Sequence, residues 1–160
     1  MTTGGSAITD ELKALIGKGM DPMIHEVERG AIRRFADAIG DPNPLFRDVD
    51  YAKKAGHPDL VAPIGFFGWT LGRGGMMELM GDIVMAMARA GFPRLLDGGM
   101  EYEYYLPAHA GDVLTSYGKI VDISEREGRT GKMLITTMET TYVNQNGNLV
   151  AKARASFINR

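Results

Sequence analysis

The 160-residue chain contains no cysteine, which excludes disulfide bonds and thiolate metal ligands. It also has no large excess of charge of either sign, because 18 Lys and Arg nearly balance 20 Asp and Glu and leave a formal net charge of −2. Such a balance predicts no nucleic-acid surface. No apolar run is long enough to span a bilayer, because the longest, around Ile83–Ala90, is short and interrupted by charge. We therefore expect neither nucleic acid nor membrane as a partner.

Motifs for metals and cofactors are absent as well. The three histidines and the carboxylates do not fall at metal-ligand spacing, and neither a phosphate-binding loop nor a dinucleotide-binding glycine pattern is present. The sequence thus predicts no metal and no cofactor. The first residues show neither the basic nor the apolar region of a signal peptide, so we expect a cytoplasmic protein.

The length suits one domain with a proper core. Residues 1–20 are predicted to be a flexible N-terminal segment with a short helix, which Thr9 or Asp10 caps and Gly17 ends. Residues 21–160 are predicted to form the domain, and it opens with a short strand at Met23–Glu28.

The segment from Gly40 to Phe46 is the most distinctive part of the sequence. It follows a helix predicted from apolar residues at helical spacing over Ile32–Ile39, and its two prolines predict an extended chain up to Leu45. A carboxylate, Asp41, and an amide, Asn43, are thereby held in a stiff turn. This pair indicates either a site or plain turn chemistry, in which Asp41 only caps backbone amides.

Helical segments fill the middle of the chain. After a short helix over Asp50–Gly56, the apolar and glycine-rich stretch Ile64–Leu71 is interpreted as a buried helix, although a buried strand has the same pattern. Met76–Ala90 is amphipathic and rich in methionine. It is predicted to pack on the core or a neighbouring subunit, or to line a bulky apolar substrate.

The last third is predicted to consist of antiparallel strands, most simply a meander of hairpins. Asn146-Gly147 is a strong turn signal between two of them. Helices followed by a run of strands indicate an α+β fold. The predicted strands are Met100–Leu106, Val113–Ile123, Lys132–Tyr142 and Leu149–Ile158.

Several motifs together resemble one known family. They are the Gly40–Leu45 turn, Ala62-Pro63, Gly98–Tyr104 and the Leu106–Leu114 segment. The sequence is similar to the MaoC-like (R)-specific enoyl-CoA hydratase and 3-hydroxyacyl dehydratase family, closest to its fungal-synthase-like (MaoC N-terminal) branch. The resemblance implies a single hot-dog fold, in which a curved antiparallel sheet wraps a central glycine-rich helix. That helix would be Ile64–Leu71.

The resemblance also implies a function, the syn addition or removal of water at the 2,3-bond of an acyl-CoA or acyl-carrier-protein thioester. Asp41 and Asn43 match catalytic positions of the family motif, whereas the motif histidine is replaced by Phe46. Backbone N–H groups at the start of the central helix would stabilise the thioester oxygen. The implied substrate-binding residues are Phe46, Pro63, Ile64, Gly65, Phe66 and Trp69.

Three interpretations of Phe46 stay open. The chain is a catalytically silent acyl-binding subunit whose partner supplies the Asp–His pair. Alternatively another histidine substitutes, with His57 as first choice, although a histidine before a proline is also typical of an exposed loop. In the third case an acid works without histidine, or the protein only binds a thioester. A homodimer, or a heteromer with a second MaoC-like chain, is expected, and His109 and Asp112 are predicted to be loop structure.

Overall fold

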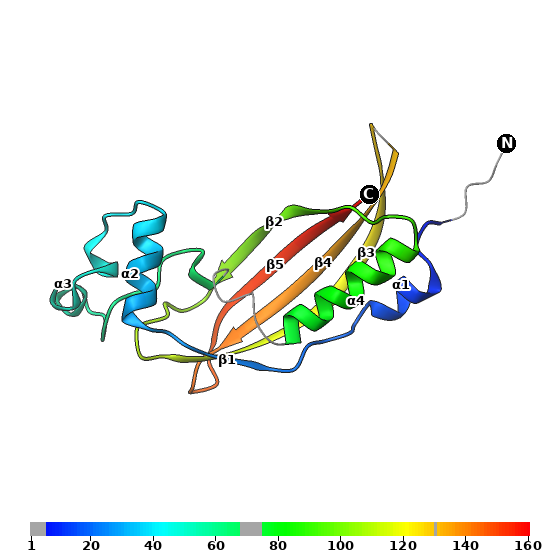
Figure 1. The fold of residues 1–160 in the computed structure, drawn as a ribbon. Coiled ribbons are helices and arrows are strands. Elements are labelled where there is room, and N and C mark those ends of the chain that lie inside the picture. The colour runs from blue at the N-terminus through cyan, green and yellow to red at the C-terminus, as the bar shows by residue number, and fades with distance from the viewer. Residues whose placement is uncertain (1–5, 68–74, 130) are drawn as a thin grey trace.

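One antiparallel sheet dominates the computed structural model, which describes residues 6–67, 75–129 and 131–160. The order of the strands in the sheet is β1-β3-β4-β5-β2, and the sheet is curled (Figure 1). The predicted strands are therefore present, with somewhat different ends. They are β1 (Met23–Glu26), β2 (Leu95–Tyr104), β3 (Val113–Gly128), β4 (Gly131–Val143) and β5 (Leu149–Asn159).

The predicted simple meander is correct only for β3, β4 and β5. β2 pairs with β5 instead of with the strand that follows it in the chain, and β1 occupies the opposite edge next to β3. The connection after Tyr104 runs from the edge strand β2 to β3, which lies next to the opposite edge strand β1, and it forms backbone hydrogen bonds on the way. Ala110 donates to the carbonyl of Leu60 and Gly111 donates to that of Val27.

The helix on the inner face of the sheet is α4 (Gly75–Arg89), which lies along the strands in Figure 1. The prediction of Ile64–Leu71 as this helix is wrong for the part that the structure describes. Residues 64–67 form a turn and one 3-10 turn, and residues 68–71 lie outside the described residues. Gly65 has a φ of +86°, which a right-handed helix does not contain.

The methionine-rich segment forms α4 and covers the inner face of the sheet, because its apolar residues recur at helical spacing. Leu79, Ile83 and Met87 are buried in one cluster with Ile120, Leu134 and Met138 of the sheet. Its interpretation as a core-packing helix is confirmed.

The remaining helices are short. Figure 1 shows α2 (Arg29–Ala38) and α3 (Val49–Lys54) beyond one end of the sheet, with the 3-10 helix η1 (Pro44–Phe46) between them in the chain. α1 (Asp10–Leu15) is capped by Thr9, as predicted, and buries Leu12 in the α4 cluster. None of the helices in the described ranges is both long and apolar enough to cross a membrane.

Strands β4 and β5 present a buried inner face. Every second residue of β4 from Leu134 to Tyr142 is buried. Opposite them on β5 stand small side chains, with Ala155 paired to Met138 and Ala153 paired to Thr140. This combination leaves space between the sheet and α4.

Helix α4 offers a matched pair of substitutions that tests this packing. Ile83 is completely buried whereas Met85 is 56% exposed. We expect Ile83→Ala to lower the free energy of unfolding by about 2 to 5 kcal/mol, because it removes buried methyl groups and leaves a cavity. Met85→Ala should change it by less than about 0.5 kcal/mol. Urea unfolding of both variants measures the difference, and equal losses would contradict the placement of α4.

Candidate functional site

The Gly40–Phe46 segment is a capped turn whose polar side chains bind its own backbone. Asp41 Oδ1 accepts a hydrogen bond from the N–H of Asn43 at 2.9 Å, and Asn43 Oδ1 accepts one from the N–H of Leu45 at 3.0 Å. Asn43 is thereby the N-cap of η1. The prediction that the chain stays extended up to Leu45 is wrong only from Pro44 on, where η1 begins, because a proline at the first position of a helical turn is compatible with that turn.

Arg47 fastens this turn to α2. Its guanidinium donates to the carbonyl of Asp41 at 2.9 Å and forms an ion pair with Asp37. The turn is therefore rigid, and its rigidity is explained by local contacts alone. The observed use of Asp41 matches the alternative in which its carboxylate caps backbone amides.

Phe46, at the position of the motif histidine, is half-buried and packs against the core. Its neighbours belong to a cluster of buried residues that includes Ile32, Leu60 and Phe66. A phenyl ring has no proton to transfer. At this position the chain thus has a packing residue in place of an acid or base.

The side chain of His57 contacts another histidine and forms no hydrogen bond with the Asp41 turn. Its Nδ1 is 3.0 Å from Nε2 of His109. No hydrogen bond or ion pair joins Asp41 and His57, both of which the structure describes. Of the three predicted catalytic residues, Asp41 and Asn43 meet in the turn, whereas His57 has no hydrogen bond to either of them.

His109 and Asp112 extend this pair into a chain of contacts. The backbone N–H of His109 donates to Asp112 Oδ2 at 2.7 Å, and Gln145 donates to Asp112 Oδ1 at 3.0 Å. Sequence reasoning classified His109 and Asp112 as loop structure and missed their link to His57. The sequence shows that His109 and Asp112 are three residues apart. It gives no sign of the contact between His109 and His57, because 52 residues separate the two histidines.

The resemblance implies that Pro63, Ile64, Gly65 and Phe66 bind the thioester. This segment follows a backbone pairing with the connection between β2 and β3. Ala62 donates to the carbonyl of Ala108 at 2.8 Å, and the Gly65 N–H donates to the hydroxyl of Tyr104 at 2.7 Å. Pro63 and Phe66 are buried, whereas Ile64 is 80% exposed. Trp69 lies outside the described residues.

The described residues form two apolar hollows, and the ring of Phe67 lines the first of them. This ring stacks on Tyr142 at 4.9 Å and lies 5.9 Å from the ring of Tyr104. The first hollow, here the cleft, encloses about 710 Å³ including its open mouth and is lined by Val61, Ala62, Ile64, Phe67, Tyr104, Tyr105, Leu106, Pro107 and Ala108. The second, here the groove, encloses about 700 Å³ between α4 and the sheet and is lined by Met80, Met100, Met138, Thr140, Ala153, Ala155 and Phe157.

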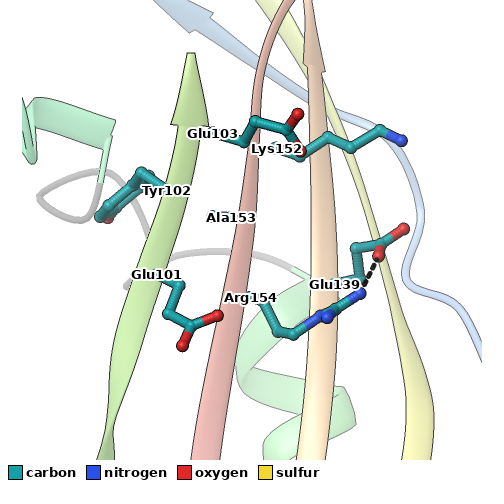
Figure 2. Close-up of a pocket in the computed structure, with 7 residues that line it drawn as sticks. All are labelled: Glu101, Tyr102, Glu103, Glu139, Lys152, Ala153 and Arg154. Atoms are coloured by element: carbon teal, nitrogen blue, oxygen red, sulfur yellow. Dashed lines mark hydrogen bonds and ion pairs between the residues drawn. The ribbon is translucent and has the colours of Figure 1, made fainter.

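A third hollow has a different character. It lies over β2, β4 and β5, and Figure 2 shows carboxylates and cations alternating around it. Arg154 forms an ion pair with Glu139 at 3.2 Å, and Glu101, Glu103 and Lys152 lie nearby. Charges of both signs on this face make it a poor site for an apolar group. The described residues contain no cluster of three or more His, Asp or Glu that could hold a metal.

The histidine pair predicts a pH dependence of stability. Burial lowers the pKa of His109, and the charge of Asp112 only partly opposes this. The unfolded chain, where the histidine pKa is about 6.5, then binds a proton more readily than the folded chain. The free energy of unfolding should therefore fall as the pH drops from about 7.5 to about 5.5.

Replacing His109 by Gln should reduce this fall, as urea unfolding at both pH values measures. Burial also lowers the pKa of His25, but that residue is present in both proteins and cancels in the comparison. An equal fall in the wild type and in His109→Gln would show that His109 does not titrate in this way.

Comparison with known families adds an independent finding. Residues 14–153 match the model of the FAS1-like dehydratase domain region. A UPF0336 protein of Thermobifida fusca is 39% identical over 120 residues, which is 75% of this chain and 76% of that protein. A probable enoyl-CoA hydratase alpha subunit of Thermomonospora curvata is 28% identical over 150 residues, or 86% of this chain and 44% of that protein.

Solved structures resemble the whole fold. The ChsH1-ChsH2 complex from Mycobacterium tuberculosis contains a chain with a TM-score of 0.76 and 22% identity, over 95% of this chain and 92% of the other. The truncated HadBC (3R-hydroxyacyl-ACP dehydratase) complex from the same organism gives 0.69 and 22%, over 90% and 96%. The predicted hot-dog fold is confirmed.

Proposed function

This chain belongs to the family of FAS1-like dehydratase domain regions, which are MaoC-like hot-dog proteins, and we propose that it is the acyl-binding, catalytically silent subunit of a heteromeric dehydratase. Its partner would be a second MaoC-like chain that supplies the catalytic Asp–His pair. The acyl group would be carried as a thioester of CoA or an acyl-carrier protein.

The observation that carries this proposal is the environment of Phe46. Hydration of an enoyl thioester needs a group that moves a proton, and the ring at this position instead packs into the core. The neighbouring Asp41 holds the turn through the Asn43 N–H. Among the described residues, Asp41 has no hydrogen bond to His57, whose Nδ1 instead contacts Nε2 of His109.

The groove supports the acyl-binding half of the proposal. It is mostly apolar and is lined by three methionines, which adapt to chains of different shape. Small side chains on β5, Ala153 and Ala155, leave room beside α4. Burying each methylene of an acyl chain there contributes about 0.8 kcal/mol.

An open sheet edge supports the need for a partner. Strand β2 lies at the edge of the sheet, and nine of its ten residues are exposed in this single chain. Among them are Leu95, Leu96 and Met100. A long exposed edge with apolar side chains favours association. The two similar solved structures are themselves complexes of two named chains.

A second candidate function rests on the His57 contacts. The Asp112 carboxylate lies 3.8 Å from Nδ1 of His109, and Nε2 of His109 is 3.0 Å from Nδ1 of His57, so that a carboxylate and two imidazoles lie in a row that a small shift of Asp112 would turn into a relay. Such a relay orients an imidazole for base catalysis. In this version the chain hydrates enoyl thioesters by itself, with His57 as the base.

Activity measurements separate the two candidates. We expect the purified chain alone to leave crotonyl-CoA unchanged, because it lacks the proton-transferring residue of the motif. Together with a MaoC-like chain that keeps the Asp-x-Asn-Pro-x-His motif, it should support turnover, followed as the loss of enoyl absorbance.

In that heteromer Asp41→Asn should leave the rate unchanged, whereas the same change in the partner's motif should abolish it. Rapid turnover by this chain alone would overturn the silent-subunit proposal. Its loss in His57→Ala would then identify His57 as the base.

The groove makes a separate prediction on binding. Ala155→Leu fills space between the sheet and α4, so binding of octanoyl-CoA should weaken about tenfold or more. Arg154→Leu alters the neighbouring residue, which lies in the charged hollow outside the groove, and should leave the affinity unchanged. Calorimetric titration of both variants measures this, and equal affinities would place the acyl chain elsewhere.

A further inference from the structure

The hydrogen bond between Gly65 and Tyr104 differs from the others that hold its segment. Between residues 61 and 66, the N–H groups of Val61, Ala62 and Phe66 donate to backbone carbonyls of Leu45, Ala108 and Pro63. The Gly65 N–H instead donates to a side-chain oxygen, the Tyr104 hydroxyl, at 2.7 Å. A side chain can rotate away without unfolding the backbone. The Gly65 N–H is therefore a donor that the protein can release.

The surroundings of this bond face the cleft. Ile64, next to Gly65 in the chain, lines the cleft, as does Tyr104 itself. Tyr104 keeps 37% of its surface exposed. Gly65 has a φ of +86°, which strongly favours glycine, so this turn and the direction of its N–H are set by the backbone. The donor, the Gly65 N–H, is thus fixed by the backbone, whereas the acceptor, the Tyr104 hydroxyl, is on a side chain that can rotate.

The phenol is suited to hold this donor. Partial burial raises the pKa of Tyr104, although the hydrogen bond from Gly65 opposes this effect. The hydroxyl is therefore neutral at physiological pH, and its oxygen accepts the N–H hydrogen bond that a carbonyl oxygen could also accept.

We propose that the Tyr104 hydroxyl stands in for a ligand carbonyl at the Gly65 N–H, so that a thioester oxygen reaches this donor only by displacing Tyr104. This inference rests on the proposed function, because it takes an acyl thioester as the ligand. Tyr104 is then a specificity-determining residue. In the wild type the donor is already satisfied, so the carbonyl of a bound thioester adds little to the affinity.

The size of the effect follows from a single hydrogen bond. An exchange of one neutral acceptor for another is close to balanced, whereas a bond to a free donor contributes about 1 kcal/mol. Removal of the Tyr104 hydroxyl should therefore strengthen binding of a carbonyl-bearing ligand about fivefold. A ligand without the carbonyl oxygen should gain nothing.

The experiment compares two ligands and three proteins by calorimetric titration. Butyryl-CoA carries the thioester oxygen, and S-butyl-CoA is its thioether, which has a CH₂ group in place of the carbonyl. The proteins are the wild type, Tyr104→Phe and the matched control Tyr105→Phe. Tyr105 lines the same cleft but does not accept the hydrogen bond of Gly65. Each variant removes one hydroxyl from one of two adjacent cleft residues.

We expect the two ligands to bind the wild type and Tyr105→Phe with similar affinity. In Tyr104→Phe, butyryl-CoA should bind about fivefold more tightly than its thioether. Equal affinities of the two ligands for Tyr104→Phe would overturn the inference and leave the proposed function standing.

A loss of butyryl-CoA affinity that is confined to Tyr104→Phe would also overturn it, since the hydroxyl would then itself donate to the thioester. Binding of neither ligand to any of the three proteins would overturn the proposed function and the inference together.

Discussion

Backbone pairing between residues 60–62 and 108–110 is the constraint on which the site depends. Ala62 donates to the carbonyl of Ala108, Ala110 donates to that of Leu60, and Val61 is bridged to His109. These bonds tie the short helices at the end of the sheet to the crossover that carries the chain from β2 to β3. The contacts of Gly65 with Tyr104 and of His57 with His109 both lie beside this tie. Each contact joins segments far apart in the sequence, and this pairing holds those segments side by side.

The second constraint is the burial of the inner face of the sheet by α4. A curled antiparallel sheet with one apolar face needs a cover, and an amphipathic helix of four turns provides it. The cover is incomplete where β5 carries small residues, and the groove occupies that space. The same packing that stabilises the fold therefore also produces the room for an apolar ligand.

A phenylalanine at the position of the motif histidine is physically compatible with the turn. The turn is held by Asp41, Asn43 and Arg47 through bonds to backbone groups, and none of these bonds involves residue 46. Residue 46 could therefore become a phenylalanine and join the core without disturbing its neighbours. A family motif can thus persist in a chain as structure after its chemistry has passed to another subunit. Under the proposed function, this chain is such a case.

Local patterns in the sequence were sufficient to predict many of the helices and strands. Alternation and turn residues in the sequence predicted β3, β4 and β5, and the cap at Thr9 predicted α1, because these features depend on neighbours within a few residues. The place of β2 in the sheet and the packing of α4 against its inner face were decided by long-range pairing and packing, which have no local signature. The site follows the same division. The sequence by itself determined that Phe46 cannot transfer a proton, since that depends on residue type. Only the tertiary structure decided which groups meet His57 and the Gly65 N–H, since their partners lie 52 and 39 residues away.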